Sequence, residues 1–289
     1  MTTKQKLQLL IIDPQNDFCD LPEAYRPLLA DGTRAAPSLP VAGAHADMLR
    51  VAGLIERAGS GLQEVFVTLD SHQHLDIAHP TFWQTAAGEP VSPFTQIEAA
   101  DVRRGRYLPR WPGARARAQA YLDELEARGR YRHMVWPVHW EIGSWGHNVH
   151  VALRAAYNAW EERTMHSVHK VSKGENPWTE HYSAIQAEVP DPSDPGTLLN
   201  AAFVSQLRQA DRVYITGEAG SHCVKATTEH LVQQLTDADV RRLVLVTDCM
   251  SPVAGFEAEQ ERFLGEMRAR GVALATAAEV EQALLENAA

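Results

Sequence analysis

The sequence predicts a three-layer α/β/α fold, with helices on both faces of a six-stranded, mostly parallel β-sheet. Two observations favour this class. Short aliphatic or β-branched runs alternate with longer stretches of helical periodicity, which is typical of parallel βαβ units. Several of the short runs end at an Asp, Lys or Gly residue, and in open parallel sheets the groups that bind ligands lie at these carboxyl ends.

Each short apolar run marks an expected strand. The first, LQLLII, shows no alternation of apolar and polar positions after Gln8, and it predicts a strand buried on both faces. The runs VFVTL and LVLVT each lead into an aspartate, whereas VYIT leads into Gly217. The expected strands cover residues 7–12, 65–69, 166–171, 213–216, 243–247 and 272–274.

The stretches between these runs repeat apolar side chains every three or four positions, as amphipathic helices do. The expected helices cover residues 44–57, 114–127, 148–163, 198–210, 224–235 and 256–270. A helix that follows a strand can carry the chain back across the sheet, which is the connection that parallel strands require.

Length and composition are those of an ordinary globular protein. The chain has 289 residues, 45% of them hydrophobic and 22% charged, enough to bury a sizeable core. With 27 basic against 37 acidic residues, the net charge of −10 disfavours nucleic acid and anionic membrane surfaces as partners. Three cysteines make a poor disulfide framework, and no apolar run has the length of a signal peptide or membrane span. We therefore expect a cytoplasmic protein.

We interpret residues 1–289 as a single domain with an insertion at about 84–132. Residues 90–130 are rich in Pro, Gly and Arg and hold one isolated amphipathic helix, while EVPDPSDPG at 188–196 predicts an exposed loop. We interpret both segments as additions to one core that form a lid or a subunit contact. The sequence leaves the formation of a homo-oligomer open.

Cys223 follows an expected strand through the tight turn GEAGSH. A cysteine at the N-terminus of a helix feels the positive end of the helix dipole, which lowers its pKa and favours the thiolate. Backbone amides in the same turn can form an oxyanion hole. The competing interpretation, a buried apolar thiol, is the one we give to Cys19 and Cys249.

Asp13 and Lys173 end strands at the same expected edge of the sheet. Asp13 could merely cap the following turn, and Lys173 could be a solvated charge. If both lie beside Cys223, the carboxylate can accept the thiol proton and pass it to a leaving amine. The ammonium group would then favour the ionised forms of both partners.

Three segments resemble the isochorismatase-like cysteine hydrolases. They are DPQNDFC at 13–19, Lys173-Gly174 followed by Tyr182-Ser183, and the pattern G-x-A-x-x-x-C-V at 217–224. The resemblance implies a catalytic triad of Asp13, Lys173 and Cys223 on a six-stranded parallel sheet. It also implies an oxyanion hole from the amides of Ala219 and Cys223, with a cis peptide bond preceding Ala219.

A carboxylate and a histidine stand two positions apart at the end of another expected strand, in Asp70-Ser71-His72. Positions i and i+2 of a strand share a face. With one more histidine they would form a three-ligand metal site that keeps positions open for water or substrate. Because the chain has 13 histidines, chance proximity remains an alternative at this point.

The order D-x-H, then His79-Pro-Thr-Phe, then Trp136-Pro-Val-His139 resembles the nicotinamidase/pyrazinamidase branch of these hydrolases. The resemblance implies one divalent metal ion, zinc before iron or manganese. Its implied ligands are Asp70, His72 and His139, with His79 as a further ligand in some members. It also implies that Phe18 and Trp136 form aromatic walls of the substrate pocket.

The activity implied by the resemblance is the hydrolysis of nicotinamide to nicotinate and ammonia through a thioester on Cys223, a step of NAD salvage. The alternative with the same chemistry is a hydrolase of another aromatic or N-carbamoyl amide. Two further alternatives are attack by a metal-bound water, with Cys223 a bystander, and a non-catalytic binding module on the same fold. The expected partner is a small amide.

Two departures from the family pattern bear on the substrate. Trp140 stands where a cysteine usually follows the W-P-x-H motif. Glu218 places a charge beside the expected cis peptide bond, where an apolar residue is expected. Together with the insertion, these residues could reshape the mouth of the pocket.

Overall fold

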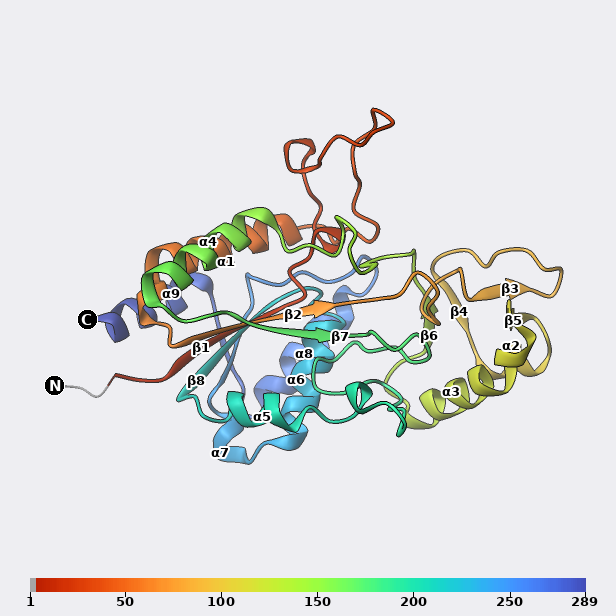
Figure 1. Ribbon diagram of the computed structural model, residues 1–289. Helices are drawn as coiled ribbons and strands as arrows, with labels where there is room; N and C mark the ends of the chain where they lie inside the picture. The colour runs from red at the N-terminus through yellow and green to blue at the C-terminus, as the bar shows by residue number, and fades with distance from the viewer. Residues whose placement is uncertain (1–3) are drawn as a thin grey trace.

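A parallel sheet runs through the centre of the computed structural model, which describes residues 4–289 (Figure 1). All neighbouring strands of this sheet pair in parallel. In spatial order the strands are β10 (Ala273–Ala275), β9 (Leu243–Val246), β8 (Arg212–Gly217), β1 (Leu7–Ile12), β2 (Glu64–Asp70) and β7 (His169–Lys173). The expected fold class is therefore confirmed. Residues 1–3, which the expected domain includes, lie outside the described residues.

Helices cover both faces of the sheet (Figure 1). On one face lie α1 (Ala44–Ala58), α4 (Val151–Thr164) and α9 (Ala277–Ala288); on the other lie α5 (Ala201–Leu207), α6 (Cys223–Gln234), α7 (Asp237–Val240) and α8 (Glu257–Ala269). Helix α1 illustrates why they pack: its buried Met48, Val51 and Ile55 recur every three or four residues and form one apolar face. Short 3-10 turns occur at Asn16–Phe18, Glu23–Tyr25, Gly59–Gly61, Pro112–Ala114 and Pro195–Thr197.

The order of the strands reverses direction between β1 and β8. From β1 the chain adds β2 and then β7 on one side, and it then returns to add β8, β9 and β10 on the other. Every residue of β1 is buried, as expected for a central strand covered on both faces. The loops after β1 and β8 separate at this switch point and leave a crevice beyond the strand ends, where parallel sheets bind ligands.

A small lobe lies beyond the carboxyl ends of β2 and β7, which point toward it (Figure 1). It contains the antiparallel pairs β3 (Trp83–Thr85) with β5 (Tyr107–Pro109) and β4 (Thr95–Ile97) with β6 (His133–Val135), and the helices α2 (Ala99–Arg103) and α3 (Arg115–Arg128). An apolar cluster of its own, which includes Trp83, Ile97 and Leu122, holds the lobe together. The expectation of one isolated helix at 90–130 was thus too simple.

The remaining differences from the sequence prediction concern boundaries and two helices that were not expected, the short α7 and α9. The helix expected at 198–210 is only Ala201–Leu207, because the side chain of Asn200 caps it by accepting a hydrogen bond from the amide of Phe203. Helix α9 was not expected, although Thr276 and Glu279 form a capping box at its start. None of the helices in residues 4–289 combines the length and the apolarity that crossing a membrane requires.

Candidate active site

Asp13, Lys173 and Cys223 meet at the switch point. Asp13 directly follows β1, Lys173 ends β7, and Cys223 is the first residue of α6. Nζ of Lys173 lies 3.0 Å from Oδ2 of Asp13 and 3.8 Å from Sγ of Cys223. All three side chains are buried. The structure therefore brings the three expected residues into one sealed group.

Neighbouring residues fix each member of this group. The hydroxyl of Thr68 accepts a hydrogen bond from the amide of Asp13 and donates one to its Oδ1. Lys173 also donates to the carbonyl of His181, at 2.9 Å. Gly217 has a φ of 114°, and a Cβ there would collide with the backbone of Ile12. Only glycine lets β8 end this close to β1 and turn toward Cys223.

Burial dominates the protonation of the group. It raises the pKa of the Cys223 thiol well above its ordinary value, although Lys173 opposes the shift. Burial also raises the pKa of Asp13 against the effect of Lys173. In Lys173 itself burial acts to lower the pKa, but the carboxylates of Asp13 and Asp70 outweigh it. The resting thiol is therefore protonated, contrary to the thiolate that the helix N-terminus alone favours, and Asp13 is a stronger base than an exposed aspartate.

The turn before Cys223 exposes two backbone amides. The peptide bond between Glu218 and Ala219 is cis, as the resemblance implies. Carbonyl oxygen of Ala219 accepts hydrogen bonds from the amides of His222 and Val224. Within residues 4–289, the amides of Ala219 and Cys223 themselves have no acceptor. Two unpaired donors at a helix N-terminus can stabilise a developing negative charge.

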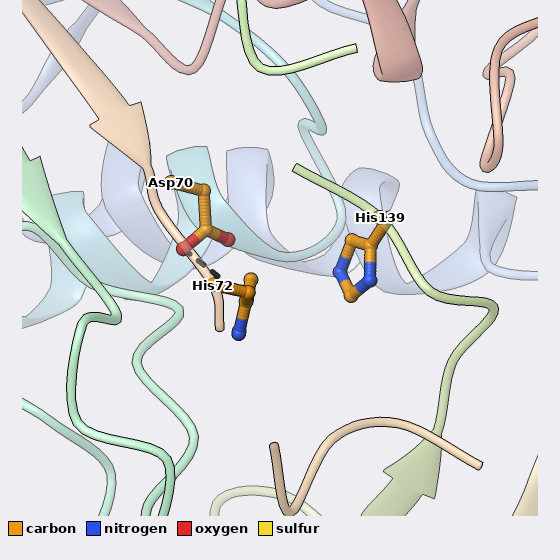
Figure 2. A group of neighbouring side chains, drawn as sticks. All are labelled: Asp70, His72 and His139. Carbon is orange, nitrogen blue, oxygen red and sulfur yellow. Dashed lines mark ion pairs between the residues drawn. The ribbon is translucent and has the colours of Figure 1, made fainter. Parts of the chain in front are cut away.

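A second group, which could bind a metal ion, lies next to the first. Asp70 ends β2, His72 follows two residues later, and His139 faces them from a separate segment after β6 (Figure 2). Each of the three offers a buried ligand atom within 4.8 Å of the other two. Oδ2 of Asp70 lies 3.0 Å from Nζ of Lys173. A single ion pair thus joins the two groups.

The unpaired atoms of this group suit a divalent ion. Oδ1 of Asp70 and both ring nitrogens of His72 are buried without a hydrogen-bond partner among the described residues. Oδ2 of Asp76 lies 3.2 Å from Nδ1 of His72, and the carbonyl of Pro137 lies 2.7 Å from Nδ1 of His139. Such outer contacts orient the rings of metal-binding histidines. A mixed set of two imidazoles and one carboxylate fits zinc, iron or manganese.

His79 lies beside this group but outside it. Its Nε2 is 2.9 Å from Nδ1 of His139, which also faces the carbonyl of Pro137. In this arrangement His79 contacts the back of a candidate ligand ring, which is the position of an orienting residue.

Both groups reach one narrow pocket, which Cys223 of the first group and Asp70 and His139 of the second line. Phe18 and Trp136 form part of its wall, together with Trp140 and Tyr182. The rings of Phe18 and Trp140 are 4.0 Å apart between centroids. The free volume is about 10 Å³, room for roughly one water molecule. A pyridine ring can therefore enter only if side chains of the wall move.

Several residues of the site were missed by sequence reasoning. The side chain of Gln15 pairs with the backbone of Asp70 through both its oxygen and its nitrogen, at 2.8 Å each. Asp17 accepts a hydrogen bond from the amide of Trp140. Both belong to the DPQNDF segment, so the segment itself was the available signal. Thr68 and Glu180 carried no such signal, because single polar residues become visible only when the fold brings them to the pocket.

Glu180 and Glu218 are buried carboxyl groups at or beside this site. Glu180 lines the pocket, and burial raises its pKa to about 7. Glu218 is the second residue of the turn that leads to Cys223, and it accepts a hydrogen bond from the amide of Ser251. Burial and the nearby Asp47 raise the pKa of Glu218 well above its ordinary value. Glu218 is therefore a neutral acid, so no carboxylate charge has to be buried beside the cis peptide bond.

Comparison with known proteins gives structural matches only. No protein-family model and no curated protein sequence matches the chain. Among solved structures, an Acinetobacter baumanii nicotinamidase/pyrazinamidase is 20% identical, with a TM-score of 0.61 over 96% of this chain and 98% of that one. The yeast nicotinamidase is also 20% identical, with a TM-score of 0.59 over 93% of this chain and 99% of that one.

The fold is shared more widely than this. An isochorismatase-like hydrolase from Alkaliphilus metalliredigens is 14% identical, with a TM-score of 0.51 over 96% of this chain and 98% of that one. The chain has the isochorismatase-like hydrolase fold. At these identities the likeness establishes the fold. Within the isochorismatase-like fold, what this chain does has to be argued from its own site.

Proposed function

We propose that the chain is a metal-containing amidohydrolase, similar to nicotinamidases, which converts nicotinamide to nicotinate and ammonia. The observation that carries the proposal is the ion pair between Asp70 and Lys173, which joins a nucleophile–base group to a metal-binding group in one pocket. A simple binding protein has no use for both. The reaction would serve NAD salvage in the cytoplasm.

Acylation begins with the transfer of the Cys223 proton to Asp13, and sulfur attacks the carboxamide carbon. The amides of Ala219 and Cys223 then hold the negative oxygen of the tetrahedral intermediate. Asp13 returns the proton to the departing amine, so that ammonia leaves and a thioester remains. Lys173 stays cationic throughout and balances whichever partner is negatively charged.

Deacylation reuses the same residues. Asp13 removes a proton from water, which attacks the thioester carbon, and the same two amides hold the oxyanion. When the carbon–sulfur bond breaks, Asp13 passes the proton back to the sulfur of Cys223 and the carboxylic acid is released. The raised pKa of Asp13 suits both steps, because a stronger base is a better proton acceptor.

Asp70, His72 and His139 would hold the divalent ion. Such an ion would act as a Lewis acid, to which the ring nitrogen of a pyridine can bind. Phe18 and Trp136 would stack against the ring, and positioning of this kind removes several kcal/mol from a reaction barrier. One related solved structure, a Pyrococcus horikoshii pyrazinamidase, is described as a complex with zinc, which makes zinc our first choice here.

The alternative proposal keeps the thiol chemistry and changes the amide. It is favoured by Trp140, which lines the pocket at the position where the family has a small cysteine. Another aromatic amide or an N-carbamoyl amide could fit the reshaped wall better than nicotinamide does.

The test is ammonia release from nicotinamide by the purified protein, measured before chelation, after it, and after metal is restored. We expect release that chelation abolishes and metal recovers. In the Cys223→Ala variant release falls at least 1,000-fold, while circular dichroism shows an intact fold. Cys249→Ala is the matched control, because Cys249 is equally buried but lies away from the pocket.

Three outcomes would change the proposal. Substantial turnover by Cys223→Ala, or resistance to thiol alkylation, would favour a metal-bound water as nucleophile. No release from nicotinamide with metal bound would favour the alternative amides, which a substrate panel identifies. No hydrolysis of any amide would point to a binding module.

A further inference from the structure

A second, outer cavity adjoins the catalytic pocket. It has a volume of about 230 Å³, far larger than the pocket around Cys223. Three aromatic residues, Trp136, Tyr182 and His222, line both spaces. They form a shared partition, so one molecule with its reactive amide at Cys223 could extend past them into the outer cavity.

His222 stands at the centre of this partition, one residue before the nucleophile. Its ring packs among four aromatic side chains, with centroid distances of 4.7 Å to Phe256, 5.4 Å to Trp136, 5.6 Å to Tyr182 and 6.3 Å to Tyr131. The side chain is only 6% exposed. The cage therefore fixes the plane and the direction of the imidazole.

Hydrogen bonds also fix the tautomer of His222. Oγ of Ser221 accepts from the amide of Val253 and lies 2.9 Å from Nδ1 of His222. The hydroxyl proton has no other acceptor among the described residues, so it is donated to Nδ1. Burial lowers the pKa of His222 to about 4, and the ring is neutral near pH 7. With Nδ1 as the acceptor the one ring proton is on Nε2, for which residues 4–289 supply no hydrogen-bond partner.

The other polar groups of the outer cavity are mainly donors. Arg130, Arg132 and Lys225 contribute cationic N–H groups, whereas Glu259 is the one carboxylate on the wall formed by the described residues. Each cation already has a carboxylate partner: Glu188 and Glu229 for Arg130, Glu98 for Arg132, and Glu229 for Lys225. Glu259 pairs with Arg262. The cavity is therefore nearly balanced in charge, and its three cationic side chains favour a ligand that brings acceptors.

We propose that the outer cavity is a second substrate subsite, in which Nε2–H of His222 donates a hydrogen bond to an oxygen acceptor on a substituent of the amide substrate. The inference rests on the proposed function and makes it more specific: the preferred substrate is larger than nicotinamide. An amide that fills the cavity without an acceptor displaces water from Nε2 without replacing its hydrogen bond, so the site discriminates against such an amide.

The experiment compares kcat/KM for nicotinamide and for pyridine-3-carboxamides that carry an acetyl, carboxylate or ethyl group. One series carries the group at ring position 5, and another carries it, through one methylene, on the amide nitrogen. Acetyl and ethyl are nearly equal in size, so their ratio isolates the hydrogen bond. In at least one series we expect kcat/KM for the acetyl or carboxylate compound to be at least 10-fold higher than for the ethyl compound. It should also be higher than for nicotinamide.

Variants assign the effect to His222. His222→Phe keeps the aromatic ring and removes the donor, and it should reduce the acceptor-to-ethyl ratio at least 10-fold. Ser221→Ala removes the hydroxyl group next to Nδ1 of His222, so that the ring can adopt either tautomer. It should reduce this ratio by less. Arg117→Gln is the control. Arg117 is a cationic residue of α3 that stacks on Trp178 and pairs with Asp191, and it does not line the outer cavity. This substitution leaves the ratio unchanged.

Binding keeps the inference separate from the proposed reaction. Dissociation constants of the acetyl- and ethyl-substituted pyridine acids are measured by tryptophan fluorescence, since Trp136 lines both cavities. If no amide is hydrolysed, the proposed function fails, and the binding ratio alone decides the subsite. Equal ratios in the wild type and His222→Phe, for turnover and for binding, would overturn the subsite.

Discussion

Lys173 is the single side chain that balances the charge of the whole site. Its ammonium group lies between the carboxylates of Asp13 and Asp70, each 3.0 Å away, and it also contacts Cys223. With all of these groups buried, water cannot screen or replace the interaction. Removing the charge of Lys173 therefore leaves two buried carboxylates without this cationic partner.

Lys173→Met should lose both activity and stability. We expect kcat to fall at least 100-fold, because Asp13 would be held protonated. We also expect the free energy of unfolding to drop by about 3–5 kcal/mol, the usual effect of breaking a buried ion pair. Steady-state kinetics and urea unfolding measure the two effects.

The control for this variant lies on the same strand. Lys170→Met removes an exposed lysine of β7 whose ammonium group lies over the ring of Tyr157, so its cost should stay below about 1 kcal/mol. If Lys173→Met were as stable and as active as Lys170→Met, the buried charge network would have no role.

At the scale of elements, the lobe of β3 to β6, α2 and α3 contributes residues at its end to the walls of the pocket and the outer cavity. Its apolar cluster is separate from the main core. The segment from Arg130 to Trp136 leaves this lobe and forms walls of both the catalytic pocket and the outer cavity. We interpret the lobe as the insertion expected at about 84–132, with its packing set by itself and its edge contributing to the site.

Truncating the centre of the lobe should destabilise it without affecting the sheet. Leu122→Ala removes a fully buried side chain of α3, and such cavities cost about 2–5 kcal/mol. Hydrogen exchange should accelerate in α3, β4 and β6, while β1 and β8 stay protected. Leu285→Ala, at an exposed position of α9, is the control. Equal acceleration in β1 would mean that lobe and sheet unfold together.

At the scale of the whole molecule, buried neutral histidines make the fold sensitive to acid. Burial lowers the pKa of His133, His150 and His222 to about 4, and that of His181 and His230 to about 3. In the unfolded chain each histidine titrates near 6.5. At these histidines the unfolded state therefore binds more protons between these values, so their contribution to stability falls as the pH is lowered from about 6.5 toward 4.

We predict that these histidines lower the free energy of unfolding between pH 7.5 and pH 5, against the opposing effect of Glu180 and Glu188, whose pKa values of about 7 favour the folded state as the pH falls. A histidine with a pKa of about 4 contributes up to about 2 kcal/mol to this loss at pH 5. Urea unfolding at both pH values measures it. His133→Asn should weaken the dependence on pH, whereas His166→Gln, at an exposed position, should not. A His133→Asn variant that keeps the pH dependence of the wild type would contradict the prediction.

The sequence alone determined the fold class and most of the two reactive groups. Runs such as Leu7–Ile12 and Glu64–Asp70 are mainly apolar and lead into or end at a carboxylate, so both the strand and the position of Asp13 or Asp70 follow from local pattern. Lys173 also marks the end of a strand, and Cys223 marks the start of a helix after a short turn. These features are local in the chain, which is why a linear sequence can carry them.

Only the tertiary structure decided how these groups behave. The helix N-terminus predicts a thiolate at Cys223, but the sealed pocket raises the pKa of its thiol, because burial depends on segments far away in the chain. Thr68, Glu180 and the cage around His222 became visible only when those segments met. Pairing, burial and cavity shape are properties of residues that are distant in sequence, and the folded chain alone brings them within contact distance.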